Sequence, residues 1–211
     1  MPFINKQDIP AASGDERRRS RDCQSLLDQL VDKNPTARRW AARDLAECSE
    51  SAMALVAQLK VEPELSVREV ILSTLTKIKN PEAIAGLVDC LRSEDAALRN
   101  EAIEAMAQCP NEVEDLMQPL LSDPDPDVRI FAVNILESLC IANVESLLIT
   151  VISNDPHVNV CATAVGVLAE IGTSASRASL EAVSRRFENE HFLTFAVELA
   201  LKRIGTGKIN E

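Results

Sequence analysis

Apolar residues recur along the chain with a spacing that places them on one face of an α-helix. In the stretch from Asp123 to Leu139, apolar residues stand at Val128 and again four, eight and eleven positions later. Because an α-helix has about 3.6 residues per turn, those positions share one helix face. With Val128 as position zero, the same frame starts at five other residues: Ala37, Val67, Leu98, Val160 and Leu193. Such repetition at intervals of 30 to 33 residues predicts a repeat protein.

Two polar columns accompany this frame. Position +1 holds arginine in the first four copies, and position −5 is acidic in five of the six copies. Those positions contain Arg38, Arg68, Arg99 and Arg129 in the first column, and Asp32, Glu62, Ser93, Asp123, Asp155 and Glu188 in the second. A further amphipathic segment precedes each frame, for example between Leu26 and Leu30. One repeat is therefore a first helix (the A helix), a short acidic turn and a second helix (the B helix), and stacked repeats would share one core.

This pattern resembles the HEAT repeats, and it is most similar to the short bacterial form of phycobilisome-lyase-type HEAT-like proteins. The resemblance rests on Asp123-Pro-Asp-Pro-Asp-Val128-Arg129, the counterpart from Asp155 to Val160, Val67-Arg68, Leu98-Arg99, and the ending Val-Leu-Ala-Glu-Ile171-Gly172. It covers about residues 22–205 and implies an all-α fold, a right-handed α-solenoid of about six helix pairs.

The resemblance also implies a role for the two polar columns, a ladder of charge-assisted hydrogen bonds between turn acids and arginines. Each arginine can reach the acid of its own turn or of the neighbouring repeat. The ladder residues carried over to this chain are Asp32, Arg38, Glu62, Arg68, Arg99, Asp123 and Arg129, with Asp32–Arg38, Glu62–Arg68 and Asp123–Arg129 as pairs. Repeats five and six have Cys161 and Thr194 in place of arginine, so we expect the ladder to end after repeat four.

Composition and charge limit the domain organisation and the partners. We expect one cooperative domain over residues 22–205, a flexible tail over 1–21 and a short tail over 206–211. Residues 22–211 carry 17 bases and 30 acids, and such an acidic body repels phosphate backbones, so we expect no nucleic-acid partner. No apolar run reaches the roughly 20 residues that a membrane-spanning helix needs. The arginine run Arg17–Arg21 is either an anion-docking site or a solvated helix start.

The cysteines predict a reducing environment. The chain contains Cys23, Cys48, Cys90, Cys109, Cys140 and Cys161. None forms a Cys-x-x-Cys pair, and we find no signal peptide before them, so we expect buried, reduced thiols in the cytoplasm. A metal site would require cysteines to gather in space, and only Cys109 and Cys140, at the ends of adjacent B helices, hint at this. We therefore expect no metal.

The last two repeats differ from the others. The B helix of repeat five is uncharged from Val160 to Ala169 and contains Gly166, which predicts burial on both sides. Repeat six contains Phe187, Phe192 and Phe195, which we expect to close the end of the core.

A partner surface is predicted on the B helices, which line the concave side of HEAT-like solenoids. Positions +2, +3, +6 and +9 fall mainly off the packed stripe. In repeats two to four the candidate binding residues are Glu69, Asn100, Glu101, Glu104, Ile130, Phe131, Asn134 and Glu137. An acidic band with an apolar spot suits a basic or amphipathic segment of another protein, although an ordinary solvated face has the same composition. The leading hypothesis is a non-enzymatic protein-binding scaffold or adaptor.

The sequence lacks catalytic motifs. The histidines are His157 and His191, and the single Glu190-His191 dipeptide is reversed relative to the paired His-Glu motifs of HEAT-fold iron hydroxylases. No Gly-rich phosphate loop or Gly-x-Ser-x-Gly motif occurs. We therefore expect neither enzymatic activity nor a cofactor. The alternative implied by the resemblance is a bilin-lyase-like subunit or chaperone that handles a tetrapyrrole chromophore on a protein.

Overall fold

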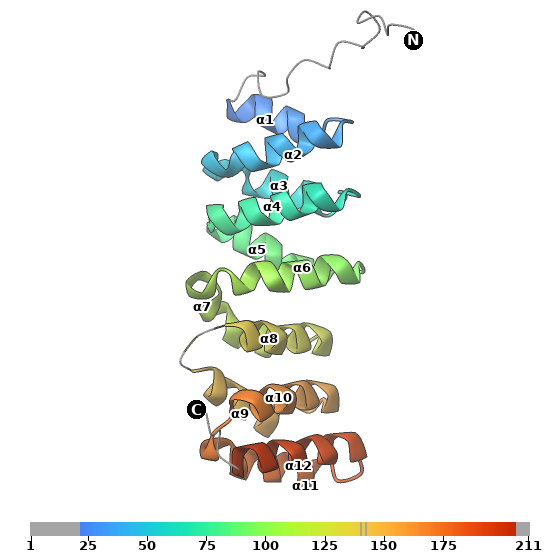
Figure 1. The fold of residues 1–211 in the computed structure, drawn as a ribbon, viewed down its shortest axis with the longest axis vertical. Helices are drawn as coiled ribbons and strands as arrows, with labels where there is room; N and C mark the ends of the chain where they lie inside the picture. Colours follow the sequence, from blue (N-terminus) through green and yellow to red (C-terminus); the bar gives the residue numbers. More distant parts are fainter. Residues whose placement is uncertain (1–21, 140, 142, 206–211) are drawn as a thin grey trace, which may run out of the picture. The chain divides into compact units, whose positions relative to one another are not determined.

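The structure, a computed structural model, describes residues 22–139, 141 and 143–205. The A helices are α1 (Cys23–Leu30), α3 (Ala52–Leu59), α5 (Pro81–Cys90), α7 (Pro110–Leu121), α9 (Val144–Asn154) and α11 (Arg177–Arg186). The B helices are α2 (Pro35–Asp44), α4 (Leu65–Ile78), α6 (Ala96–Ala107), α8 (Pro126–Ser138), α10 (Val158–Ile171) and α12 (His191–Gly205). Short 3₁₀ turns are η2 (Leu45–Glu47), η3 (Ser49–Ser51) and η4 (Ser174–Ser176). The described residues contain no strand, and the predicted all-α fold of successive helix pairs is confirmed (Figure 1).

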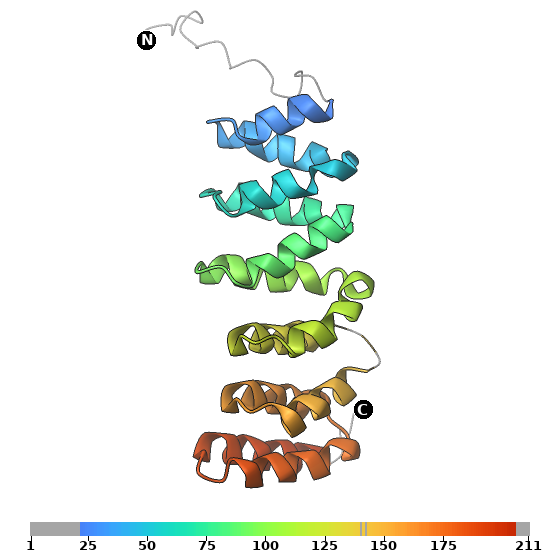
Figure 2. The same ribbon diagram turned by 180° about the vertical axis from the view of Figure 1, so that it is seen from behind.

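The chain forms two compact units, the N-terminal unit (residues 1–86) and the C-terminal unit (residues 87–211), with the boundary inside α5. In the N-terminal unit, α2 packs against α1 and α4. In the C-terminal unit, α8 packs between α6 and α10, and α10 packs between α8 and α12. Within the C-terminal unit, α8, α10 and α12 lie in front in Figure 1, and Figure 2 shows this unit from behind. One cooperative domain over 22–205 stays a prediction, and the predicted tails over 1–21 and 206–211 lie outside the described residues.

The acidic turn before each B helix also starts that helix. Asp95 accepts hydrogen bonds from the backbone N–H groups of Ala97 and Leu98, at 2.9 and 3.3 Å. Asp125 accepts one from the N–H of Asp127 at 2.9 Å. These side chains satisfy N–H groups that have no partner within the helix. Helices α5 and α7 begin at Pro81 and Pro110, where proline's missing N–H sacrifices no hydrogen bond within the helix.

The predicted apolar frame is the core of the helix pairs. Of its 24 positions, 20 are buried. The exceptions are Ile78, Leu201 and Ile204, which are half-buried, and Ile171, which is 40% exposed. The period therefore identifies the face that each B helix turns toward its A helix.

Positions +5 and +7 connect successive B helices. The hydroxyl of Thr74, at +7 in α4, donates a 2.9 Å hydrogen bond to the carbonyl of Ala42, at +5 in α2. Position +5 thus faces the following repeat, and Val133 and Val165 are buried there. In the last repeat this position is Glu198, which is exposed. A polar residue therefore occupies the side of α12 on which a further repeat would pack.

Two expectations for the last repeats are wrong. Phe192 and Phe195 do not close the core, because they are 50% and 68% exposed. Helix α10 is not buried on both sides, because Gly166 is exposed and a methyl group added there would meet nothing within 4 Å. Both errors have one cause: hydrophobic composition does not specify which side of a helix its neighbours cover.

Candidate functional site

The arginines at +1 join successive repeats. Arg38 binds Glu62 of the next repeat through two hydrogen bonds, Nε to Oε2 at 2.7 Å and Nη2 to Oε1 at 2.6 Å. Arg129 binds Asp155 in the same way, at 2.7 and 3.1 Å. All four side chains are largely buried. The paired geometry is the strong form of an arginine–carboxylate contact. We call the Arg38–Glu62 and Arg129–Asp155 pairs the inter-repeat clamps.

These pairings correct the ladder expected within repeats. Arg38 reaches the turn of its own repeat through the backbone carbonyl of Asp32, at 2.9 Å, and Arg129 reaches the carbonyl of Asp123, at 2.7 Å. The carboxylate of Asp123 is bound by Arg92. The inter-repeat alternative is therefore the observed one, because position +1 projects toward the following repeat.

In the third repeat, the arginine at +1 keeps its contact with a backbone carbonyl of its own turn, and its other partner is an aromatic ring. Arg99 donates to the carbonyl of Ser93 at 2.6 Å. Its guanidinium carbon also lies 5.6 Å from the centre of the Phe131 ring. A cation over an aromatic face at this distance is a favourable contact. Arg99 and Phe131 therefore link α6 to α8 on the B side.

The contacts between repeats do not end with Arg129. Position +1 of repeat five is Cys161, and Arg186 of repeat six reaches the same turn. The Nη2 of Arg186 lies 2.9 Å from the carbonyls of Ile152 and Asp155, and 3.2 Å from the Cys161 sulfur. Burial raises the pKa of the Cys161 thiol, so this group is neutral near pH 7. The sequence analysis missed Arg92 and Arg186 because neither belongs to a repeating column.

Hydrogen bonds lower the pKa of two acids that bind arginines of the preceding repeat or helix, Glu62 and Asp123. Burial by itself would raise the pKa of Glu62, but hydrogen bonds from Arg38, Gln58 and the N–H of Glu64 outweigh it and lower the pKa below the usual range. For Asp123, burial by itself would also raise the pKa. The hydrogen bond from Arg92 is the main contact that lowers this pKa below the usual range. These carboxylates remain charged at neutral pH. They serve the contacts between repeats, so their charge needs no catalytic explanation.

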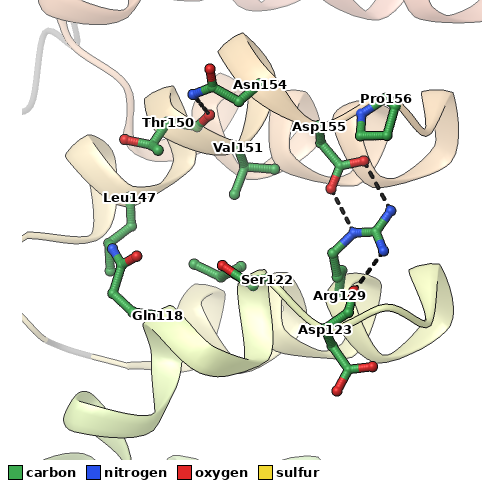
Figure 3. A pocket seen from close by; sticks show the side chains of 11 residues that line it. Gln118, Ser122, Asp123, Arg129, Leu147, Thr150, Val151, Asn154, Asp155 and Pro156 are labelled. Carbon is green, nitrogen blue, oxygen red and sulfur yellow. Dashed lines mark hydrogen bonds and ion pairs between the residues drawn. The ribbon is translucent and has the colours of Figure 1, made fainter.

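A cavity of about 320 Å³ lies in the C-terminal unit beside the Arg129–Asp155 clamp (Figure 3). Its wall contains Leu121, Leu147 and Val151 as apolar residues. The remaining lining residues are Gln118, Ser122, Asp123, Arg129, Thr150, Asn154, Asp155 and Pro156. None of these lining residues is a histidine or cysteine. The wall therefore lacks the serine–histidine or cysteine–histidine pair that commonly activates a nucleophile.

The predicted binding residues divide into two groups. Glu69, Asn100, Glu104 and Glu137 are exposed, whereas Glu101, Ile130, Phe131 and Asn134 are half-buried. Seven of the eight lie in the C-terminal unit, on the neighbouring helices α6 and α8, and Glu69 lies in the N-terminal unit. Phe131, at position +3 of α8, is half-buried beside Arg99 of the preceding B helix α6. Whether these residues bind a partner remains a prediction.

The expectation of reduced cysteines is wrong for one pair. Cys23 and Cys48 form a disulfide that joins α1 to the segment after η2. Disulfides persist in oxidising compartments, so the cysteines no longer support a cytoplasmic location. Cys90, Cys109 and Cys161 are buried and do not form disulfides, as expected, and Cys140 lies outside the described residues. Within the described ranges no three His, Cys, Asp or Glu side chains gather as metal ligands.

No helix in the described part of the chain combines the length and apolarity needed to cross a bilayer. Among curated proteins, none matches the sequence. Several solved structures are similar to this chain at low sequence identity.

Three of these structures illustrate the range. An archaeal HEAT-like repeats protein from Thermococcus onnurineus NA1 is 18% identical with a TM-score of 0.45, covering 86% of this chain and 88% of that one. Human deoxyhypusine hydroxylase is 17% identical with a TM-score of 0.45, covering 88% and 75%. The complex of CpcE and CpcF of phycocyanin lyase from Nostoc sp. PCC7120 is 17% identical with a TM-score of 0.37, covering 97% and 99%.

The family comparison covers most of the sequence. Residues 23–107 and 113–202 match the family described as HEAT repeats. These ranges contain most of the helix pairs, 22 of the 24 positions of the apolar frame, and the Arg38–Glu62 and Arg129–Asp155 pairs. The chain therefore belongs to the HEAT-repeat family.

Proposed function

We propose that this protein is a non-enzymatic scaffold or adaptor that binds a basic or amphipathic segment of another protein on its B helices. The observation that carries the proposal is the charge of α6 and α8. Their outward positions include Glu104, Asp127 and Glu137, all exposed. The bases of these helices, Arg99 and Arg129, both bind backbone carbonyls of the acidic turns. The outward face of the two helices is consequently negative, which favours a basic partner.

The test is a pull-down from native lysate at low and high salt. The bait is either the wild-type protein or the double variant Glu101→Lys, Glu104→Lys. A partner captured by the wild type should be lost from the variant and should be released by salt, since exposed charges are screened. Glu114→Lys with Asp115→Lys is the matched control, because these two exposed acids lie on the A helix α7. Equal capture by both variants would disprove the proposed surface.

An absorbance spectrum of the eluate tests the absence of a cofactor. A scaffold should elute with a colourless partner. A visible tetrapyrrole band would instead support a lyase-like or chaperone role. The proposed lack of catalysis is supported by the chain's histidines, because neither His157 nor His191 is among the residues that line the cavity.

A further inference from the structure

An exposed apolar stripe lies on α12. Phe192, Phe195 and Leu199 are 50%, 68% and 42% exposed, and their spacing of three and four residues places them on one face of the helix. The buried residues Leu193, Val197 and Ala200 mark the opposite face. Large apolar side chains grouped in this way commonly mark an interaction site.

The stripe is not the open end of the repeat stack. It occupies positions −1, +2 and +6, which point away from the A helices. The equivalent side chains at +2 and +6 of α6, Asn100 and Glu104, are exposed as well. The side on which a further repeat would pack carries the exposed Glu198 instead. The stripe therefore belongs to the outward face of the B helices.

The outward face changes in character across the C-terminal unit. From α6 to α12, position +2 holds Asn100, Ile130, Ala162 and Phe195, and position +6 holds Glu104, Asn134, Gly166 and Leu199. Helices α6, α8, α10 and α12 pack side by side in this order (Figure 1). The acidic end at α6 thus passes into an apolar end at α12.

Helix α10 leaves the apolar end accessible. Gly166 has open space above its Cα, so no packing contact in the structure requires a glycine there. Glycine inside a helix lowers stability relative to alanine. Gly166 occupies position +6 of α10, as Leu199 does in the neighbouring α12, and glycine leaves the helix surface uncovered there.

We propose that α12 is the apolar anchor site for a partner segment whose other end is basic and lies over α6 and α8. Charge complementarity supports this occupant, because Glu104, Asp127 and Glu137 are exposed at the far end of the same face. Neighbouring helix axes lie about 8–10 Å apart, so the span from α6 to α12 is roughly 30 Å. An extended segment of about nine residues covers that distance. The inference rests on the proposed function and adds the anchor site and the direction of the segment.

Fluorescence anisotropy with two synthetic ten-residue peptides tests the inference. One peptide has Phe and Leu in its first four positions and Lys and Arg in its last four, and the other has the same composition in alternating order. The wild-type protein should bind the first more tightly. Phe195→Ser with Leu199→Ser should weaken that binding about tenfold or more at both low and high salt, as expected for lost apolar burial. Glu101→Gln with Glu104→Gln should weaken it mainly at low salt.

Met53→Ser is the matched control, because Met53 is 73% exposed on the A helix α3, and it should bind like the wild type. If the serine pair on α12 has no effect while the glutamine pair does, the anchor is wrong and the scaffold proposal survives. If neither pair has an effect, both proposals fail. Equal affinity for the two peptides would contradict the proposed direction of the bound segment, with its apolar end on α12 and its basic end over α6 and α8. Analytical ultracentrifugation measures the oligomeric state. If the wild type is a dimer and Phe195→Ser with Leu199→Ser makes it a monomer, a second copy of this chain occupies the stripe, and the inference is wrong.

Discussion

Removing Arg129 should destabilise the C-terminal unit far more than removing Arg203. Arg129 donates two hydrogen bonds to Asp155 and others to the carbonyls of Asp123 and Pro124. Arg129 and Asp155 are only 9% and 7% exposed. Loss of one partner from such a buried pair leaves an uncompensated charge, which typically costs about 3–5 kcal/mol. The N–H of His157 still binds Asp155 at 2.8 Å, so we expect about 3 kcal/mol for Arg129→Ala.

Arg203 provides the matched comparison. It pairs with Glu170, but the two side chains are 48% and 63% exposed. Exposed pairs contribute about 0.2–1 kcal/mol because water and salt screen them. Arg203→Ala should therefore lower the free energy of unfolding by about 0.5 kcal/mol.

Urea unfolding followed by circular dichroism measures both variants. A double variant, Arg129→Met with Asp155→Leu, should recover most of the loss, because no lone buried charge remains. Fluorescence of Trp40, which lies on α2 in the N-terminal unit, tests whether the chain unfolds as one domain. Coincident fluorescence and dichroism transitions would support a single domain. Equal midpoint shifts for Arg129→Ala and Arg203→Ala would refute the assignment of Arg129 as an inter-repeat clamp.

Three further predictions concern stability. Gly166→Ala should stabilise the protein by about 0.5–1 kcal/mol, whereas Gly86→Ala should destabilise it, because the added methyl would lie 2.1 Å from a valine side chain; thermal melts compare the two. Cys23→Ser with Cys48→Ser should cost about 3 kcal/mol, since the bridge closes a 25-residue separation, and a reductant should reproduce that loss in the wild type alone. The lowered pKa of Glu62 contributes stability that is present above its unfolded pKa of about 4.3 and is lost as pH falls through the folded pKa; Glu62→Gln should flatten this acid loss, and an unchanged slope would contradict it.

The sequence determined the helix pairs, because their signal is local. A period of 3.6 residues is a property of a single helix, and its four apolar positions per repeat identify the face that becomes buried. Turn acids and prolines likewise act on the nearest backbone N–H groups, so the starts of helices such as α7 could be predicted at Pro110. The arginine column could be recognised from its recurrence, and the resemblance to HEAT repeats indicated its structural role.

Only the tertiary structure decided which residues meet across repeats. Arg38 binds the Glu62 carboxylate of the next repeat and reaches its own turn through the Asp32 carbonyl, because position +1 points toward the next helix pair. The bridge between Cys23 and Cys48 depends on how the end of repeat one returns to α1, which no spacing rule encodes. The exposure of Phe195 depends on the absence of any described element over that side of α12. Periodicity specifies a direction around one helix axis, whereas partners and exposure depend on how neighbouring axes are placed.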